Sequence, residues 1–248
     1  MAPDYHHIAY LGLEVANPVG METVLAAAER SGLPSSARVL DIGAGTGGVS
    51  AALARRFGYQ VFAIERDPVM VSHIGERVRA EGLSDRVTAV RGVAPQVLDL
   101  LAPADMMVAM GSTRIGGPDV TTPAGLFQVL AARLAPNGHI LWGDLTWIAE
   151  APPPLRQVVG LSGVYADDEG WRTAATAAGM VCVSAEISPQ DVWDGFFASA
   201  DRRVRDWLDA HPGVEGWDAL KLRADQIKAT FDFGRPYLGF GLYLFRKH

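Results

Sequence analysis

The chain has 248 residues, of which 49% are hydrophobic and 20% charged, and its formal net charge is −6. This length and composition suit one large α/β domain, and we expect residues 1–248 to form a single domain. The acidic balance, with no Lys/Arg cluster of five or more residues, disfavours nucleic acid as a partner because tight binding to its backbone needs a basic face. The single cysteine, Cys182, excludes an internal disulfide framework and a cysteine-based zinc site.

The N-terminal stretch Met-Ala-Pro-Asp-Tyr-His-His has neither a basic region nor an apolar core. No segment approaches the roughly eighteen consecutive apolar residues that a membrane-spanning helix needs. We therefore expect a cytoplasmic protein with no membrane partner, present as a monomer or homodimer. No group of His, Asp and Glu has the spacing of metal ligands, so we expect no metal.

Hydrophobic periodicity predicts helices and strands that alternate along most of the chain. We expect helices at 21–30, 47–57, 68–81, 95–101, 122–134 and 169–178. We expect strands at 38–42, 60–64, 87–91, 106–110, 139–143, 181–187 and 237–245. This alternation is typical of a parallel sheet with helices on both faces.

Two segments depart from the alternation. Residues 146–168 contain Pro152-Pro153-Pro154, and we predict an extended connection there. Residues 188–234 carry two amphipathic helical patterns separated by His211-Pro212-Gly213. We expect this second segment to be a helical insertion before the last strand.

A glycine cluster follows the first predicted strand. Residues 39–50 read Val-Leu-Asp-Ile-Gly-Ala-Gly-Thr-Gly-Gly-Val-Ser, so an apolar strand meets a tight turn and a helix opens directly after it. Glycine lets the backbone turn sharply and approach a ligand closely, and the N-terminus of the helix offers unpaired N–H groups. The pattern predicts a site for a nucleotide-like cofactor.

Asp41 narrows the choice of cofactor. A dinucleotide would place a pyrophosphate against this turn, and a carboxylate beside it would repel the phosphates. S-adenosylmethionine (SAM) has no phosphate and carries an ammonium and a sulfonium group, which Asp41 would attract. Glu65 ends the second predicted strand twenty residues after Gly45 (65 − 45) and can accept hydrogen bonds from both ribose hydroxyls. Asp67-Pro68 reads as the cap and first turn of the next helix.

The D-x-G-x-G-x-G pattern that begins at Asp41 resembles motif I of the class I SAM-dependent methyltransferases. Residues 134–144, Leu-Ala-Pro-Asn-Gly-His-Ile-Leu-Trp-Gly-Asp, look like the turn and fifth strand of that family. Residues 110–117 and the ending Arg-Pro-Tyr-Leu-Gly-Phe-Gly from position 235 resemble a bacterial group of small-molecule methyltransferases. The resemblance implies a Rossmann-like α/β sheet that is mostly parallel with an antiparallel last strand. It also implies SAM as cofactor, S-adenosyl-L-homocysteine as its product, and a small-molecule acceptor.

The resemblance also implies which residues bind the cofactor. They are Asp41, Gly43, Ala44, Gly45, Thr46, Glu65, Arg66, Met110 and Gly111. One position departs from the family pattern: many relatives have Gly-Asp after the third strand, where this chain has Gly92-Val93. Backbone groups near Val93 and Ala94, or the Gln96 side chain, would then hold the adenine.

Candidate catalytic groups are few. Methyl transfer needs a base only when the accepting atom carries a proton with a high pKa. Asp144 ends the fifth strand at the expected edge of the sheet, although an ordinary loop or capping role would also suit it. His7, or His6 beside it, is a second candidate, with a flexible exposed tail as the alternative. Tyr237 is a third, since it could form a hydrogen bond with the substrate.

Substrate contacts are expected around the same edge. If the last strand runs antiparallel, residues 188–234 leave from and return to the rim of the site, which makes them a lid. Arg114 could bind a substrate carboxylate, or pair with Asp119 or Asp144 instead. The candidate substrate-binding residues are Ser112, Arg114, Trp147, Tyr165, Trp193 and Arg235. Two other functions stay open: a nicotinamide-dependent oxidoreductase and a SAM-binding protein without catalysis.

Overall fold

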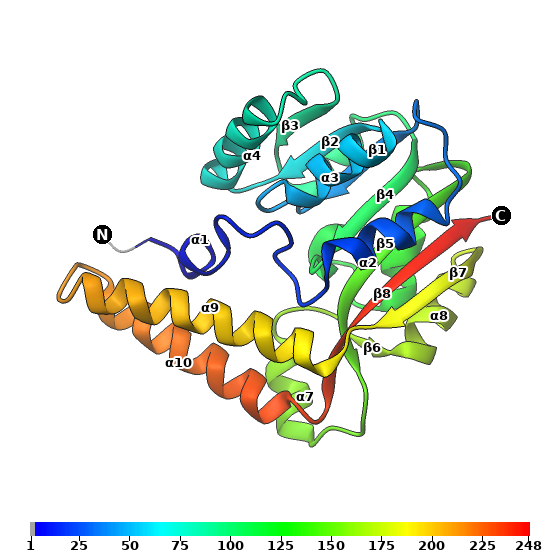
Figure 1. Cartoon of the computed structure of the whole chain (residues 1–248). Coiled ribbons are helices and arrows are strands. Elements are labelled where there is room, and N and C mark those ends of the chain that lie inside the picture. The colour runs from blue at the N-terminus through cyan, green and yellow to red at the C-terminus, as the bar shows by residue number, and fades with distance from the viewer. Residues whose placement is uncertain (1–2) are drawn as a thin grey trace.

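The computed structural model describes residues 3–248, and a single sheet runs through its centre (Figure 1). The strand order is β3-β2-β1-β4-β5-β8-β7, and the short β6 pairs with β5. The strands are β1 Arg38–Ile42, β2 Gln60–Glu65, β3 Val87–Arg91, β4 Ala104–Met110, β5 Leu134–Trp147, β6 Ala166–Asp167, β7 Met180–Ile187 and β8 Leu238–Lys247.

Strand directions match the predicted sheet. The pairs β1–β2, β2–β3, β1–β4 and β4–β5 are parallel. β8 is antiparallel to both β5 and β7, so it returns between two strands that share a direction. The predicted mostly parallel sheet with an antiparallel last strand is confirmed. The carboxyl ends of β1, β2, β3, β4 and β5 therefore lie along one edge.

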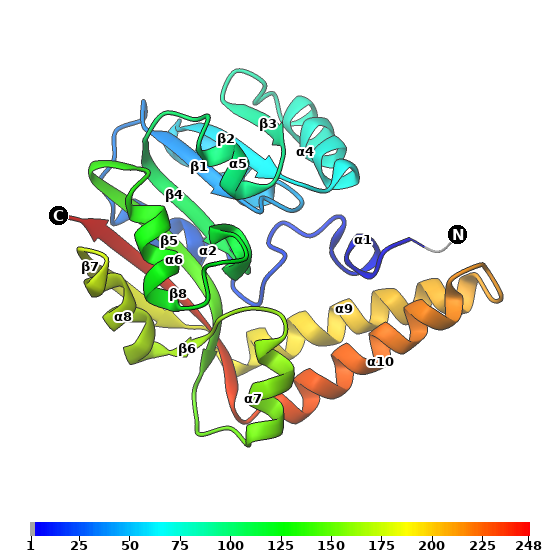
Figure 2. The same ribbon diagram turned by 180° about the vertical axis from the view of Figure 1, so that it is seen from behind.

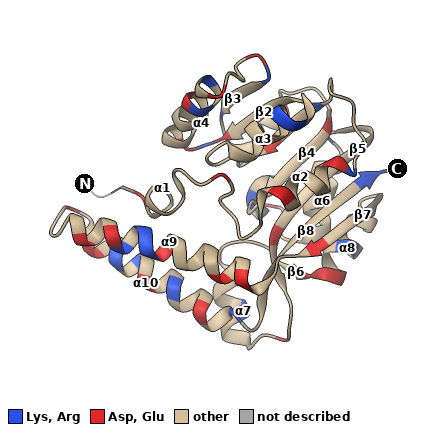
Figure 3. Cartoon of the chain, in the orientation of Figure 1, with Lys and Arg blue, Asp and Glu red and all other residues tan. Residues whose placement is uncertain are grey.

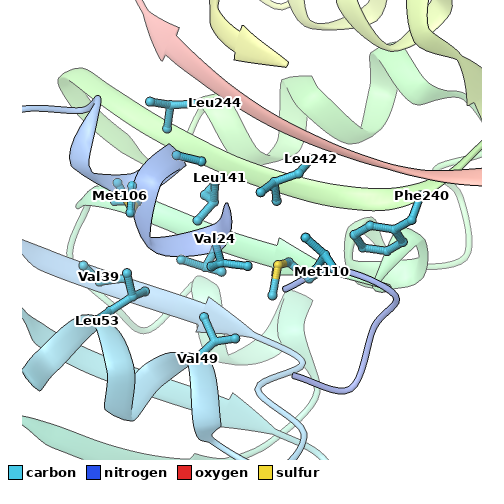
Figure 4. Close-up of a cluster of buried hydrophobic side chains, with 14 of the residues drawn as sticks. Val24, Val39, Val49, Leu53, Met106, Met110, Leu141, Phe240, Leu242 and Leu244 are labelled. Carbon is cyan, nitrogen blue, oxygen red and sulfur yellow. The ribbon is translucent and has the colours of Figure 1, made fainter. Parts of the chain in front are cut away.

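Helices cover both faces of the sheet (Figures 1 and 2). On one face, apolar residues of α2 Met21–Glu29, α3 Gly48–Phe57 and α4 Pro68–Ala80 join those of β1, β2, β3, β4, β5 and β8 in one cluster. Figure 4 shows this cluster, with Val24 of α2 and Val49 and Leu53 of α3 among the strand residues. On the other face lie α5 Ala94–Leu98, the 3-10 helix η1 Thr113–Gly116, α6 Pro123–Ala131 and α8 Asp168–Ala177.

The prediction for residues 146–168 is wrong. β5 continues to Trp147, and the helix α7 Pro153–Gly160 follows. Prolines suit the first turn of a helix because their N–H groups would have no partner there and their φ angle is already helical. Leu155 and Val159, four residues apart, are both buried and hold α7 against the main core.

The predicted helical insertion forms a hairpin of α9 Gln190–Ala210 and α10 Trp217–Gly234, which lie side by side in both views (Figures 1 and 2). A helix that was not predicted, α1 Tyr5–Tyr10, packs on this hairpin. Tyr5 and Ala9 of α1 share a separate apolar cluster with residues of both long helices, namely Ala200, Val204, Leu208, Leu220 and Ala224. Across residues 3–248, no helix has the length and apolar character that crossing a membrane requires.

Candidate active site

The glycine turn after β1 has a backbone that only glycine adopts readily. Gly43, Gly45 and Gly47 have φ angles of 74°, 54° and 73°, in the left-handed region where a side chain would be strained. The N–H groups of Gly43 and Ala44 donate to the carbonyl of Ile64 at 2.9 and 3.1 Å. The turn is therefore fastened to the end of β2, and α3 begins directly behind it.

Asp41 lies beneath this turn. It is 4% exposed, and Ser50 of α3 donates its hydroxyl to Oδ2 at 2.6 Å. Burial raises the pKa of the Asp41 carboxyl to about 6; the negative charge of Glu65 adds to this effect and the Ser50 bond opposes it. The Asp41 carboxylate thus joins β1 to α3, and its direct contact with a cofactor stays a prediction.

Glu65 holds three backbone N–H groups at the end of β2. Its Oε2 accepts from Gly45 at 3.0 Å, and its Oε1 accepts from Arg66 at 2.7 Å and Asp67 at 3.0 Å. The β2 backbone also accepts from Gly92 at 3.0 Å, so the end of β3 and its exposed neighbour Val93 lie next to Glu65. This arrangement brings the predicted ribose and adenine positions side by side.

The ends of β1 and β4 lie side by side, at the point where open α/β sheets have their ligand crevice, and we call this place the crevice. A Cβ on Gly43 would lie 2.3 Å from the Ser112 hydroxyl, so Ser112 packs directly on the glycine turn. Gly111, with φ 68°, donates to the carbonyl of Gly143 at 2.7 Å. The chain order of the strands reverses between β1 and β4, and ligands of open α/β sheets bind at such a point.

Asp144 is a buried carboxyl on β5, next to this crevice. It is 3% exposed, its Oδ1 accepts from the Leu145 N–H at 2.8 Å, and its Oδ2 has no hydrogen-bond partner within residues 3–248. Burial raises its pKa to about 7, an effect that the N–H groups of Leu145 and Ser112 partly oppose. A carboxyl with this pKa and a free oxygen can take up a proton near neutral pH.

The other two candidate bases lie apart from Asp144. His7 Nε2 is 2.8 Å from Asp67 Oδ2, just beyond the end of β2. Three strand spacings, about 14 Å, separate β2 from β5. Tyr237 precedes β8, four residues before Gly241, the partner of Asp144, which corresponds to about 13 Å of strand. The structure therefore does not bring the three predicted catalytic residues together.

Three predicted substrate-binding residues support the chain around α7. Arg114 donates to the carbonyls of Leu161 and Ser162, and in the described part of the chain it pairs with neither Asp119 nor Asp144. The Tyr165 hydroxyl lies 2.9 Å from that of Ser162. Trp147 is 9% exposed, and the guanidinium of Arg156 sits 4.9 Å from the centre of its ring. Arg114 thus attaches the loop after α7 to η1, and Trp147 attaches α7 to β5.

On the hairpin, Trp193 is 3% exposed and packs against Phe197 and Phe231, with ring centroids 4.7 and 5.7 Å apart. Arg235 forms a two-pronged ion pair with Asp194, at 2.7 and 2.6 Å. The structure thus places Trp193 in the core and uses Arg235 to join α10 to α9. Substrate contacts by these two residues stay a prediction.

Sequence patterns missed the segment between α1 and α2. The carbonyl of Leu13 accepts from the Thr46 hydroxyl at 2.8 Å, and a Cβ on Gly48 would lie 2.0 Å from the Glu14 carbonyl. Asn17 lies against Gly111 at the end of β4. Gly48, which directly follows the D-x-G-x-G-x-G motif, was the one signal, because it permits this close approach of another stretch of backbone.

The architecture recurs in known proteins. A family model described as a methyltransferase domain matches residues 39–138. The crystal structure of a SAM-dependent methyltransferase from Geobacter sulfurreducens in complex with S-adenosyl-L-homocysteine superimposes with a TM-score of 0.84. It is 25% identical, and the match covers 100% of this chain and 99% of that one. The chain belongs to the class I SAM-dependent methyltransferases. Its cofactor is SAM.

A second relative of this methyltransferase covers nearly the same length. YjhP, an uncharacterised protein of Escherichia coli strain K12, is 25% identical over 214 residues, which are 83% of each chain. Its crystal structure has a TM-score of 0.83. A structure from Thiobacillus denitrificans, again a SAM-dependent methyltransferase with S-adenosyl-L-homocysteine, also has a TM-score of 0.83, at 23% identity over 100% of this chain and 99% of that one.

The residues at this edge have chemistry that is compatible with SAM. Glycine is required at two positions because Ser112 and Asn17 pack where a Cβ on Gly43 and on Gly111 would lie. Two carboxyl groups, Asp41 and Glu65, stand at the ends of β1 and β2, and carboxylates attract the positive charges that SAM carries. No group of three or more His, Cys, Asp or Glu within residues 3–248 could hold a metal ion.

Proposed function

We propose that this methyltransferase acts on a small-molecule acceptor bound between the ends of β4 and β5, and that Asp144 is its general base. The observation that carries the proposal is the Oδ2 atom of Asp144, which is buried without a hydrogen-bond partner in the described structure. A buried polar atom without a partner is costly. An acceptor that donates a proton to this oxygen would remove that cost.

The proposed cofactor contacts follow the edge of the sheet from β3 to β4. Val93 and Ala94 hold the adenine, and Glu65 and Arg66 hold the ribose. The methionine end lies over the glycine turn, Asp41 to Thr46, and beside Met110 and Gly111. Support comes from the order β3-β2-β1-β4, which places these positions in succession, and from the S-adenosyl-L-homocysteine named in two of the similar structures.

The chain's own task is to orient the acceptor and to exclude water. SAM supplies an activated methyl group on its sulfonium. Ser112 and the Gly111 backbone would position the acceptor beside that methyl group, and Asp144 would take the proton that the accepting atom loses. A pKa of about 7 leaves a substantial ionised fraction at neutral pH. An acceptor hydroxyl, such as that of a phenol, is the group that needs this help.

Surface charge supports a small acceptor over a nucleic acid. Figure 3 shows basic and acidic residues interspersed on the α9–α10 hairpin. Several basic residues there are neutralised by neighbours: Arg205 pairs with Asp201 and Asp225, and Lys228 pairs with Asp232. Paired charges offer little attraction to a phosphate backbone.

A transfer screen tests the proposal. Wild-type protein, Asp144→Asn and the exposed control Asp85→Asn are incubated with methyl-labelled SAM and a library of phenols, alcohols, amines and thiols, and in parallel with a cell extract. We expect a labelled small-molecule product whose formation falls roughly 10²- to 10⁴-fold in Asp144→Asn and stays unchanged in the control. Label that appears only in the macromolecular fraction of a cell extract would refute the small-molecule acceptor. Full activity in Asp144→Asn would refute the base.

A further inference from the structure

The segment between α1 and α2 crosses the edge of the sheet where the crevice opens. We call residues 11–19 the N-terminal strap. Its Leu13 carbonyl accepts from the Thr46 hydroxyl at 2.8 Å and from Arg77 Nη2 at 3.3 Å, while Arg77 Nε donates to the Thr46 carbonyl at 3.1 Å. The strap is therefore fastened to the glycine turn and to α4.

The second half of the strap, around Asn17, is held in place by a local backbone hydrogen bond and by the proline that follows Asn17. The carbonyl of Asn17 accepts from the Val19 N–H at 2.8 Å, and Pro18 and Val19 are buried. The residue before a proline is restricted to extended conformations. Asn17 is thus held with its side chain toward the end of β4, where its Oδ1 lies 2.6 Å from the place that a Cβ on Gly111 would take.

The side-chain amide of Asn17 makes only a weak hydrogen bond to the end of β4. It is half-buried, and Nδ2 donates to the Met110 carbonyl at 3.5 Å, the outer limit for a hydrogen bond. Ser112, two residues from Met110, touches Gly43 on the opposite side of the crevice. The Asn17 side chain, the Ser112 hydroxyl and the glycine turn therefore converge on one space, at the junction of β1 and β4.

We propose that Asn17 binds the amino-acid end of SAM. An amide side chain offers both a donor and an acceptor, so Nδ2 can donate to the carboxylate of the cofactor or Oδ1 can accept from its ammonium. The inference rests on the proposed position of SAM over the glycine turn. It adds a contact from outside the sheet, and the bound cofactor would then hold the strap closed over the crevice.

A truncated ligand separates this contact from a structural role. 5′-Methylthioadenosine has the adenine, ribose and thioether of the cofactor but lacks the amino-acid end. Calorimetry would measure the affinities of SAM, S-adenosylhomocysteine and methylthioadenosine for wild type, Asn17→Ala and Asn17→Asp, with the exposed amide variant Gln157→Ala as control. We expect Asn17→Ala to weaken SAM and S-adenosylhomocysteine roughly ten- to a hundredfold, the loss typical of a hydrogen bond to a charged group.

Methylthioadenosine should bind Asn17→Ala as it binds wild type, and Gln157→Ala should change none of the affinities. Asn17→Asp tells which group of the cofactor Asn17 binds. If this variant binds SAM as tightly as wild type, Asn17 binds the ammonium group. If it binds SAM more weakly than Asn17→Ala does, Asn17 binds the carboxylate. Equal weakening of all three ligands, or unchanged SAM affinity in Asn17→Ala, would overturn the inference. A protein that binds SAM in this way but methylates no small molecule would overturn only the proposed acceptor.

Discussion

Glu65 is hydrogen-bonded to Gly45: its Oε2 accepts from the glycine N–H at 3.0 Å. Because the other carboxylate oxygen accepts from Arg66 and Asp67, one side chain organises the glycine turn and the first residues after β2 together. The acidic residue at the end of β2 thus has a structural task besides the contact with ribose that we propose for it. Removal of the Glu65 side chain should therefore affect both the order of the glycine turn and the affinity for SAM.

We predict that Glu65→Ala weakens SAM binding by roughly 1.5–3 kcal/mol, because a charged acceptor is lost. The glycine turn should also become less ordered, which would appear as faster amide exchange at Gly45. Calorimetry and hydrogen exchange measure the two effects. Glu186→Ala, which removes an exposed carboxylate from β7, is the matched control. SAM affinity equal to that of wild type would contradict the proposed ribose contact.

The contribution of the Ser50–Asp41 hydrogen bond to the free energy of unfolding should depend on pH. Asp41 ionises with a pKa of about 6, so above that pH the Ser50 hydroxyl stabilises a buried negative charge. We expect Ser50→Ala to lower the free energy of unfolding by about 1.5–3 kcal/mol at pH 8 and by less at pH 5, where Asp41 is protonated. Urea denaturation at both pH values, with the exposed Ser72→Ala as control, is the measurement. An equal loss at both would contradict this account.

The buried Asp144 carboxyl should lower the free energy of unfolding as the pH rises. Its pKa is about 7 in the folded chain against 3.8 for an ordinary aspartate, so between these values the folded state retains a proton that the unfolded state has lost. Stability from this group therefore falls as pH rises from about 4 to 7 and is constant above. The advantage of Asp144→Asn over wild type should grow across that window, on the order of a few kcal/mol. A pH-independent difference would show that Asp144 ionises normally.

The hairpin of α9 and α10 is expected to act as a lid. If a Gly/Ser linker replaces residues 190–234, we expect SAM to bind while methyl transfer becomes much slower, because water enters and the acceptor is misplaced. Phe196→Ala is a milder variant, since Phe196 stacks on Tyr10 of α1 at 5.7 Å and its loss should loosen α1 without opening the main core. Wild-type transfer rates in either folded variant would contradict the lid.

Local patterns predicted the elements that carry the cofactor crevice. The range expected for β1, 38–42, is the observed one, and β3 also matches its expected range, because short apolar runs flanked by turn residues are recognisable without tertiary information. The glycine turn was equally readable, since its positive φ angles demand glycine.

What the patterns missed depends on contacts between distant parts of the chain. α1 has six residues, too few for a stable isolated helix, and it is held by the residues of α9 and α10. His7 was noted, but its partner Asp67 is sixty residues away. Asn17 carries no recognisable motif, and only the path of the strap brings it to Gly111.

The pairing of α1 with the hairpin has a consequence for the order of folding during synthesis. Tyr5 and Ala9 leave the ribosome early, but Ala200, Val204 and Leu220 of their cluster are made about 200 residues later. At roughly 5–20 residues per second, that delay is on the order of 10–40 s. The glycine turn and its strands can form during this interval, whereas α1 cannot dock until α9 and α10 have been made. The docking of α1 on the hairpin therefore follows the folding of the glycine turn.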